Sequence, residues 1–396
     1  MSGNIINAID IRPDRVICLI AQELEIVNKG TFLQLIGYGI EEFPLNCSDP
    51  FQLDELELKN KIKKVILKAE NESNTRIKEA YVNIFDSNKS ILIDDEIDLN
   101  NSLVTEDVIK SFFKKNQFQS LYMDQQEPLH SFPISFRIDN AKSVSDPIGI
   151  KAKTLTTKWH IILSNSNQLE NIMSIFESMN ISITQFVASC YASTLATLND
   201  VETSLGAVLI DIGKMKTFIS YIFDNQLISF QEIPIGTYHI SKDISQLMNV
   251  SIEDADDIRK RLNTIGEQQL RDKIDIDSSQ IFNSRCEELV ELIQREIENS
   301  KYSYLVDNNI IITGKGSKSI KIIKQIKKVM SKKHIRLGST LKFNGLKTIV
   351  DNPSLTSSFG LLLYSSSHDL EFNGNNSVNN KNNSIFSNIY NFFKSI

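Results

Sequence analysis

Two aspartates stand at the ends of largely apolar segments that resemble each other. Asp10 follows the run 5–9, and a short turn then leads to a second apolar run. Asp211 follows the run 207–210 in the same way. This pattern is typical of a buried strand, a turn and a returning strand. A carboxylate at such a position can orient a magnesium ion through bound water, but aspartate also favours turns at strand ends, so both roles stay open.

A third segment has the composition of an anion-binding turn. The apolar run 310–312 leads into residues 313–317 (TGKGS), where the glycines precede an expected helix start. Backbone N–H groups at a helix N-terminus can face a phosphate group or another ligand. Two aspartate hairpins across a cleft, with this loop beside them, resemble the superfamily of actin, the sugar kinases and the DnaK-type chaperones. The expected fold class is therefore α/β, with duplicated domains around a nucleotide cleft.

The chain has the composition of a globular protein with two or more domains. It has 396 residues, of which 41% are apolar, and this length exceeds one ordinary hydrophobic core. Its four cysteines show neither metal-ligand spacing nor a paired framework, which indicates a reducing compartment and no metal site. No signal peptide is expected, because no basic region followed by an apolar one stands at the start. No apolar run approaches the roughly 18 residues that a spanning helix needs.

Positive charge is concentrated between residues 301 and 350. Twelve lysines and arginines stand there against one acid, Asp307, so this segment carries +11 and the remainder −17. Between Ile320 and Met330 the apolar residues recur with helical spacing. The lysines on the opposite face are Lys321, Lys324, Lys327 and Lys328. No aromatic residues are interleaved with them, which disfavours nucleic acid as a partner. The basic face, 318–333, is either solvated or placed against anionic lipid.

The last thirteen residues, 384–396, form an amphipathic segment behind a polar linker, 366–383. In a helix the apolar side chains fall within an arc of about 160°, with the polar ones opposite. The apolar residues are Ile385, Phe386, Ile389, Tyr390, Phe392, Phe393 and Ile396. A peptide this short is marginal as a free helix in water, so we expect it to fold as it enters a membrane surface. The alternative is a terminal helix docked on the protein's own body, which the long polar linker disfavours.

Several segments resemble one family, the bacterial cell-division protein FtsA, in order and in spacing. They are residues 127–139, 146–149, 158–162, 233–244, 335–338 and 357–362. The resemblance covers nearly the whole chain and implies four subdomains, a linker and a terminal membrane-targeting helix. The implied limits are 1–84 and 164–195 for subdomain 1A, 85–163 for 1C, 196–230 and 301–365 for 2A, 231–300 for 2B, 366–383 for the linker and 384–396 for the helix.

The resemblance also implies nucleotide-binding positions, with ATP and magnesium as the cofactors. These positions are Asp10, Arg12, Asp211, Gly213, Lys214, Lys216, Thr217, Gly236, Asp256, Arg259, Gly314, Gly316 and Ser317. In the family, an acidic and a basic residue at the positions of Asp256 and Arg259 face the ribose and the adenine. Their spacing of three places both on one side of a helix. Without the family, an ordinary solvated pair explains them equally well.

The phosphate loops depart from the family pattern. The first loop has Arg12 and Pro13 where the family has glycine and a small hydroxyl residue. Proline removes an N–H donor, and arginine fills space that glycine leaves open. The second loop reads DIGKMKT (211–217) where the family has DIGGGTT, and Lys315 interrupts the glycines of the third loop.

Two interpretations of the cleft follow from these changes. Either the cations Arg12, Lys214 and Lys216 replace the lost backbone donors and nucleotide still binds, or they pair with the two strand-end aspartates and close an empty cleft. We favour the second interpretation. Neither predicts efficient hydrolysis. Ser189 stands where many actin relatives place an acidic or amide residue near the attacking water.

Resemblance to FtsA implies a self-assembling tether that links FtsZ polymers to the cytoplasmic face of the bacterial inner membrane, at the division site, and recruits later division proteins. In the family, subdomain 2B receives the C-terminal peptide of FtsZ. Arg285 is the matching basic residue and is expected at the start of a helix over 286–293, where a solvated helix-end charge is the other explanation. The alternative functions are a pilus-assembly scaffold of the PilM type and a divergent FtsA paralogue that does not bind FtsZ. The degraded loops disfavour a small-molecule kinase.

Overall fold

The computed structural model describes residues 3–26, 30–44, 54–84, 89–113, 125–139, 141, 143–144, 146–264, 273–306, 308–341 and 343–365. The predicted linker and the predicted amphipathic helix, 384–396, lie outside the described residues. Within the described ranges, no helix combines the length and the apolar content that crossing a bilayer requires.

The first half of the molecule is built on a six-stranded sheet with the order β15-β3-β2-β1-β4-β9. The strands are β1 (Ile5–Ile11), β2 (Arg15–Ile26), β3 (Gly30–Glu42), β4 (Glu79–Ile84), β9 (Ser182–Ala188) and β15 (Phe343–Asn344). β1 pairs antiparallel with β2 and parallel with β4. The inner strands are apolar on both faces, as is typical of a sheet covered on both sides.

The second half repeats this arrangement in a five-stranded sheet with the order β12-β11-β10-β13-β14. The strands are β10 (Ala207–Ile212), β11 (Thr217–Phe223), β12 (Gln226–Ile233), β13 (Asn309–Thr313) and β14 (His334–Leu337). β10 pairs antiparallel with β11 and parallel with β13, just as β1 does with β2 and β4. The predicted duplication of strand, turn and returning strand is therefore confirmed.

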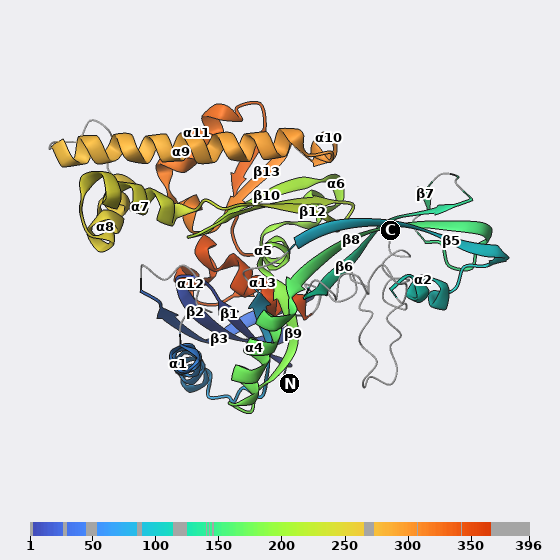
Figure 1. Cartoon of the computed structure of the whole chain (residues 1–396). Coiled ribbons are helices and arrows are strands. Elements are labelled where there is room, and N and C mark those ends of the chain that lie inside the picture. Colours follow the sequence, from blue (N-terminus) through green and yellow to red (C-terminus); the bar gives the residue numbers. More distant parts are fainter. Residues whose placement is uncertain are drawn as a thin grey trace.

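Helices α5 (Ser189–Thr197) and α13 (Thr356–Tyr364) lie between the two sheets (Figure 1). Every residue of α13 is buried, which is typical of a helix in the core of a large protein. A Cβ atom at Gly360 would lie 1.8 Å from the carbonyl oxygen of Ala192, so glycine lets the two backbones touch. This close packing holds the first turn of α13 beneath the end of β1.

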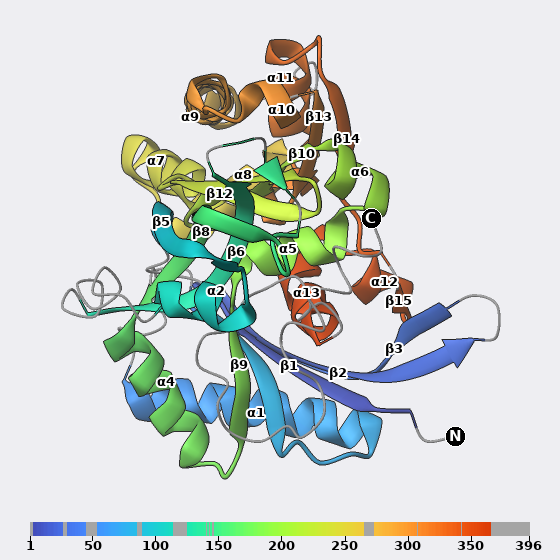
Figure 2. The ribbon, with the colours of Figure 1, turned by 90° about the vertical axis from the view of Figure 1, so that its right-hand side faces the viewer.

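The remaining helices cover the outer faces. α1 (Glu55–Ser73) and α4 (Ser166–Glu177) lie beneath the six-stranded sheet in Figure 2, while α7 (Thr237–Met248), α8 (Ile252–Leu262), α9 (Lys273–Asn299) and α11 (Ile320–Val329) form the opposite outer layer. Three short helices stand in the connections: α6 (Asp200–Leu205) between α5 and β10, α10 (Ser303–Val306) between α9 and β13, and α12 (Lys347–Val350) between β15 and α13.

The expected start of a helix near Arg285 is wrong. α9 begins at Lys273, so Arg285 lies in the middle of a helix of 27 residues. The buried positions before Arg285 recur every three or four residues but are mostly small or polar, for example Asp275 and Ser278. A search for apolar periodicity therefore misses the first half of α9.

An insert between β4 and β9 forms a third sheet with the order β5-β8-β6-β7. Its elements are β5 (Lys89–Leu103), α2 (Glu106–Phe113), β6 (Gln126–Ile138), β7 (Ser143–Val144) and β8 (Lys151–Asn165). It has its own core around the buried Trp159. The insert also contacts both halves, since the Ala188 N–H donates to His130 Nε2 at 2.9 Å and His160 Nδ1 lies 2.6 Å from the Leu227 carbonyl oxygen.

Candidate functional site

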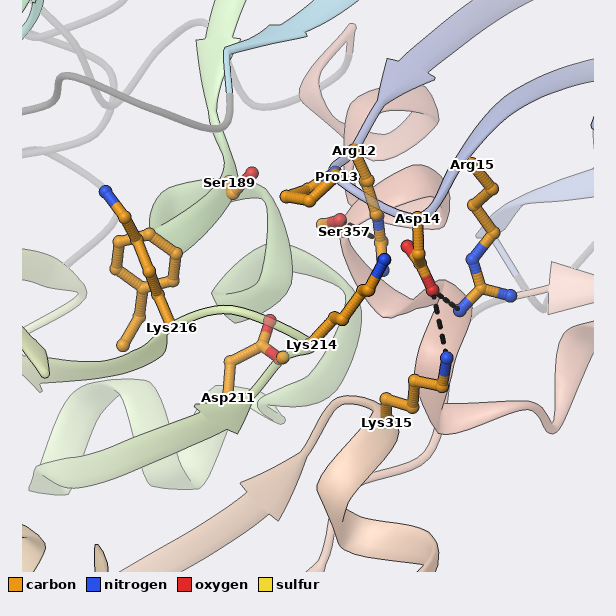
Figure 3. A pocket seen from close by; sticks show the side chains of 12 residues that line it. Arg12, Pro13, Asp14, Arg15, Ser189, Asp211, Lys214, Lys216, Lys315 and Ser357 are labelled. Carbon is orange, nitrogen blue, oxygen red and sulfur yellow. Dashed lines mark hydrogen bonds and ion pairs between the residues drawn. The ribbon is translucent and has the colours of Figure 1, made fainter. Parts of the chain in front are cut away.

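The three loops singled out in the sequence meet between the two halves. The turn after β1, the loop after β10 and the η3 turn (Lys315–Lys318) after β13 line one cavity (Figure 3). The lining residues are Arg12, Pro13, Asp14, Arg15, Ser189, Asp211, Gly213, Lys214, Lys216, Phe218, Lys315 and Ser357. The cavity measures about 30 Å³, enough for one or a few water molecules. A pocket for a small organic ligand typically measures roughly 300–1,000 Å³.

Arg12 stands in the turn after β1 and contacts the start of α13. Its Nε donates to Asp10 Oδ2 at 2.8 Å, and its Nη1 donates to the Ser354 carbonyl oxygen at 2.7 Å. Its Nη2 donates to the Ser357 hydroxyl. The guanidinium thus joins the end of β1 to the start of α13. The predicted pairing of Arg12 with Asp10 is confirmed.

The electrostatic surroundings of Arg12 favour its charged form. Burial by itself would lower the pKa of Arg12, but the carboxylates of Asp10, Asp211 and Asp14 outweigh burial and raise it. A guanidinium held in this way is a permanent cation of the cleft.

The carboxylate of Asp10 is buried and has donors on both oxygens. Asn83 Nδ2 donates to Oδ1. The hydroxyls of Ser357 and Ser358 donate to Oδ2 at 3.0 and 2.6 Å, beside the Arg12 contact. A magnesium ion would have to displace these donors to use Asp10.

Asp211 occupies the matching end of β10 and lies deep in the cleft. Ser193 of α5 donates to its Oδ2 at 2.6 Å. Burial raises the pKa of Asp211, against the lowering by this hydrogen bond and by Arg12. Gly314 has a φ of +81°, and a Cβ atom there would lie 2.2 Å from Asp211 Oδ1. The third loop therefore needs glycine to close over this carboxylate.

An ion pair crosses between the two halves. Lys315 Nζ, from the third loop, lies 3.2 Å from Asp14 Oδ2 in the first loop, and Arg15 Nη2 lies 3.4 Å from the same oxygen (Figure 3). Burial alone would raise the pKa of Asp14, but Arg15, Lys315 and Arg12 outweigh it and lower that pKa. Asp14 therefore remains a carboxylate that attracts cations from both sides of the cleft.

The lysines of the second loop contact residues beyond the strand-end aspartates. Lys216 Nζ lies 2.7 Å from Glu232 of β12. Lys214 is buried, with Nζ 5.5 Å from the centre of the Tyr238 ring. The pairing of these lysines with the strand-end aspartates stays a prediction. The loop turns towards the start of α7, because the Tyr238 N–H donates to the Lys214 carbonyl oxygen at 2.9 Å.

The glycines and hydroxyls of these loops hold the loops to each other. A Cβ atom at Gly236 would lie 2.4 Å from the Lys214 carbonyl oxygen, and one at Gly316 would lie 2.2 Å from Ile212 Cγ2. The Thr217 hydroxyl donates to the Ile235 carbonyl oxygen at 2.7 Å. The N–H of Gly213 donates to the Lys216 carbonyl oxygen at 2.9 Å.

The third loop is closed in the same way. The Gly314 N–H donates to the Pro353 carbonyl oxygen at 3.1 Å. The Ser317 hydroxyl donates to the Gly314 carbonyl oxygen at 2.8 Å. These backbone and hydroxyl donors are therefore used within the protein.

Asp256 and Arg259 lie on one side of α8, as their spacing predicted, and both are buried. Arg259 Nη2 lies 2.7 Å from Asp256 Oδ1, and the Ser241 hydroxyl of α7 donates to that oxygen at 2.9 Å. Burial would raise the pKa of Asp256, but Arg259 and the hydrogen bonds outweigh it and lower the pKa to about 2. The pair joins α7 to α8, and neither residue lines the cavity of about 30 Å³.

Arg285 lies on the side of α9 that faces α7. Its Nε donates to Asp243 at 2.5 Å and its Nη1 to Glu288 at 2.6 Å. The hydrogen bond that Arg285 donates to Asp243 is the main cause of the raised pKa of Arg285. The guanidinium has five N–H donors in a planar fork, so two anchoring contacts fix its orientation at the surface.

Two family models match this chain. The model described as cell division protein FtsA matches residues 208–360, and the model described as the SHS2 domain inserted in FtsA matches residues 86–163. Together these matches span more than half of the chain. This protein belongs to the FtsA family. The FtsA resemblance inferred from the sequence is confirmed, and the insert with β5 to β8 is the family's inserted domain.

Full-length relatives agree with this assignment. The cell division protein FtsA of Rhizobium meliloti (strain 1021) is 25% identical over 93% of this chain and 89% of its own length. The cell division protein FtsA of Buchnera aphidicola subsp. Acyrthosiphon pisum is 26% identical over 95% of this chain and 93% of its own length. This FtsA-family protein therefore has a role in cell division.

Solved structures confirm the actin-like fold. A PilM–PilN type IV pilus biogenesis complex superposes with a TM-score of 0.68 and 11% identity, covering 91% of this chain and 98% of the other. MreB 5 of Spiroplasma citri bound to AMPPNP superposes with a TM-score of 0.53 and 11% identity, covering 93% and 97%. The second protein thus binds a nucleotide on the same fold.

In this FtsA-family chain, the cleft does not fit a magnesium–nucleotide complex as it stands. The cavity is about a tenth of the size of a small-ligand pocket, and the donors and carboxylates are already engaged. Within the described ranges, no group of three or more His, Cys, Asp or Glu residues is arranged to hold a metal ion.

Several residues that build the FtsA-family cleft were missed in the sequence. These residues contact partners that stand far away in the chain: Asp14 contacts Lys315, Asn83 contacts Asp10, and Ser193 contacts Asp211. For the serines at the start of α13 a signal existed, because residues 357–362 belong to a segment that resembles the family. Ser189, at the first turn of α5, lines the cavity and donates to Asn83 Oδ1 at 2.8 Å.

Proposed function

We propose that this FtsA-family protein tethers FtsZ polymers to the cytoplasmic face of the bacterial inner membrane, assembles with itself and recruits later division proteins. The observation that carries the proposal is the match to FtsA over 93% of the chain, which includes the inserted domain. The subdomain limits and the terminal amphipathic helix expected from the sequence are part of the same proposal.

Arg285 is the residue that we assign to the peptide of FtsZ. It stands at the surface of α9 with its guanidinium oriented by Asp243 and Glu288. The remaining N–H donors of the fork suit a carboxylate of an extended acidic peptide. The peptide would share this cation with Asp243, so the contact is expected to be salt-sensitive.

We further infer that the protein works with little or no ATP hydrolysis. The support is the position of Arg12, whose guanidinium pairs with Asp10 and bonds to Ser354 in the cleft. A nucleotide would have to displace these contacts and the pair of Lys315 with Asp14. Asp10 and Asp211 therefore serve as acceptors for protein donors, with nucleotide and magnesium as weak ligands at most.

A pilus-assembly scaffold is the alternative function. The TM-score of 0.68 to a PilM–PilN complex supports the same fold, but at 11% identity it supports nothing further. Both family models favour the division role instead.

Flotation of lipid vesicles with FtsZ polymers tests the tether. The full chain should carry FtsZ into the vesicle fraction, and a chain truncated after Asp369 should leave FtsZ behind. The variant Arg285→Glu should float with vesicles but without FtsZ, whereas Arg295→Glu, the same change at an exposed position of α9, should behave like the full chain. Flotation of FtsZ by the truncated chain would refute the membrane assignment, and equal recruitment by Arg285→Glu would refute the peptide assignment.

A further inference from the structure

A second cavity lies between the C-terminal half of α9 and the end of α11, far from the cleft. It measures about 420 Å³. The residues that line this α9–α11 groove are Gln294, Ile297, Glu298, Ile310, Val329, Met330, Ser331, Lys332 and Lys333. Its size lies within the range of pockets that accept a ligand or an anchor side chain.

The floor of the α9–α11 groove is apolar. Ile297, Ile310 and Met330 are buried in the core of the second half, and Val329 is partly buried beside them. An apolar side chain that entered the groove would pack against these residues and gain the free energy of its own removal from water.

The rim is polar and mainly basic. Lys332 is exposed and Lys333 partly exposed, in the turn that follows α11. Glu298 is the only acid in the lining, and Gln294 Nε2 donates to its Oε1 at 2.7 Å. The rim therefore favours an anionic partner over a cationic one.

The neighbouring surface of α11 extends this positive charge. Lys321 is held against α9, with Nζ 2.8 Å from the Ser279 hydroxyl and 5.0 Å from the centre of the Phe282 ring. The lysines of α11 that are exposed are Lys324, Lys327 and Lys328. They continue the basic surface from the groove along the helix.

The groove is distinct from the peptide site assigned to Arg285. Gln294 lies nine residues further along α9, which places it about 13 Å along the axis and about 180° around it. Arg285 contacts α7, whereas the groove opens towards α11 and β13. α9 thus presents two separate surfaces.

The shape of the groove favours a protein partner over a bilayer. Its apolar floor lies between α9, β13 and the end of α11, so it accepts single side chains and not a flat lipid surface.

We propose that the α9–α11 groove binds an acidic peptide that carries an apolar anchor residue. The anchor enters the apolar floor, and acidic residues on either side of it meet Lys332 and Lys333 on the rim. The selectivity resides in charge, because the floor accepts any apolar side chain of suitable size.

Fluorescence anisotropy with three synthetic 15-residue peptides tests this proposal on the full chain. The peptides share a central Leu-Phe pair and differ in flanks of glutamate, serine or lysine. We expect the glutamate peptide to bind at least about tenfold more tightly than the serine peptide, with no binding of the lysine peptide. Lys332→Glu combined with Lys333→Glu should remove this preference. Ser331→Trp, at an exposed position on the rim, should block both the glutamate and the serine peptide.

Two controls separate the groove from general electrostatics. Lys324→Glu combined with Lys327→Glu makes the same charge change on α11 outside the lining, and Arg285→Glu changes the other surface of α9. Both should retain binding of the glutamate peptide within about threefold. Equal binding of all three peptides, or equal losses in the control and groove variants, would overturn the proposal. A third outcome would assign the groove to lipid instead. In that case none of the peptides would bind, the truncated chain would bind phosphatidylglycerol vesicles, and Lys332→Glu with Lys333→Glu would abolish this vesicle binding.

Discussion

The ammonium group of Lys315 lies 3.2 Å from a carboxylate oxygen of Asp14. Lys315 follows β13 in the second half of the molecule, and Asp14 stands in the turn between β1 and β2 in the first. The side chain of Lys315 thus joins the two halves of the molecule.

Lys315→Met should loosen the contact between the halves. Asp14 would keep Arg15 as a partner, so we expect a loss of only about 1 kcal/mol in the free energy of unfolding, given that Lys315 is partly exposed. Hydrogen exchange of the amides in residues 12–16 and 313–318 should rise, since these loops form the contact. Lys324→Met, at an exposed position of α11, should change neither quantity. Unchanged exchange in both loops of Lys315→Met would show that the ion pair does not hold the cleft.

Arg12→Ala should lower the free energy of unfolding by more than Lys315→Met does. The substitution leaves the buried carboxylate of Asp10 without its cation, for which losses of about 3–5 kcal/mol are typical. Arg12→Lys should recover only part of the lost stability. An ammonium group lacks the planar fork of donors with which the guanidinium reaches Asp10, Ser354 and Ser357 at once. Urea unfolding of both variants measures the difference. A loss below about 1 kcal/mol for Arg12→Ala would mean that the guanidinium is dispensable to the cleft.

The stability of the protein should fall between about pH 6.5 and pH 4 because of His160. Its Nδ1–H donates to the Leu227 carbonyl oxygen, and its Nε2 accepts from the Ser90 hydroxyl at 2.8 Å, so the ring is neutral in the fold. Burial lowers the pKa of His160 from 6.5 to about 4. In this window the unfolded chain binds the proton and the folded chain does not, so the free energy of unfolding decreases as the pH falls.

The loss from His160 should reach up to about 3 kcal/mol at pH 4. Urea unfolding at several pH values measures it, with His160→Gln as the matched variant that cannot titrate. The variant should show a flatter profile over this window. Asp256 contributes at lower pH, because its pKa is lowered to about 2 and its stabilisation is lost only as the pH falls below about 4. Identical slopes for both proteins between pH 6.5 and 4 would exclude His160 as the cause.

Membrane binding should depend on assembly. The seven apolar residues of 384–396 have little charge to support them, with only Lys394 on the polar face, and insertion must also order the helix. Side-by-side polymers multiply the anchors without changing any contact. Binding to neutral vesicles should therefore rise steeply with protein concentration, and Phe392→Ser should shift the curve to higher concentration. A strictly monomeric variant that binds as tightly as assembled protein would contradict this.

Local patterns explain why the sheets could be predicted from the sequence. The strand that ends at Asp10 and the strand that ends at Asp211 each show a buried run followed by a turn, and this signal lies within about fifteen residues. The topology of a duplicated actin-like fold then places both carboxylates at the cleft. The start of α9 was missed because small polar residues, not apolar ones, keep its first half buried.

The partners of the cleft residues could not be predicted in this way. Arg12 and Ser357 stand 345 residues apart in the chain, and no periodicity connects them. Spacing places Asp256 and Arg259 on one side of α8, but it does not show that this side faces Ser241 of α7. Long-range pairing follows from the packing of elements, so charge and spacing leave the choice of partner open.

Recruitment of FtsZ polymers to vesicles with and without magnesium–ATP tests the central claim most directly. We propose that this FtsA-family protein is a membrane tether whose cleft Arg12 and Lys315 keep closed. Preformed FtsZ polymers and the full chain would be mixed with vesicles after removal of ATP, and the floated FtsZ would be measured before and after the addition of magnesium–ATP. We expect the same recruitment in both conditions. Recruitment that appears only with magnesium–ATP would contradict it.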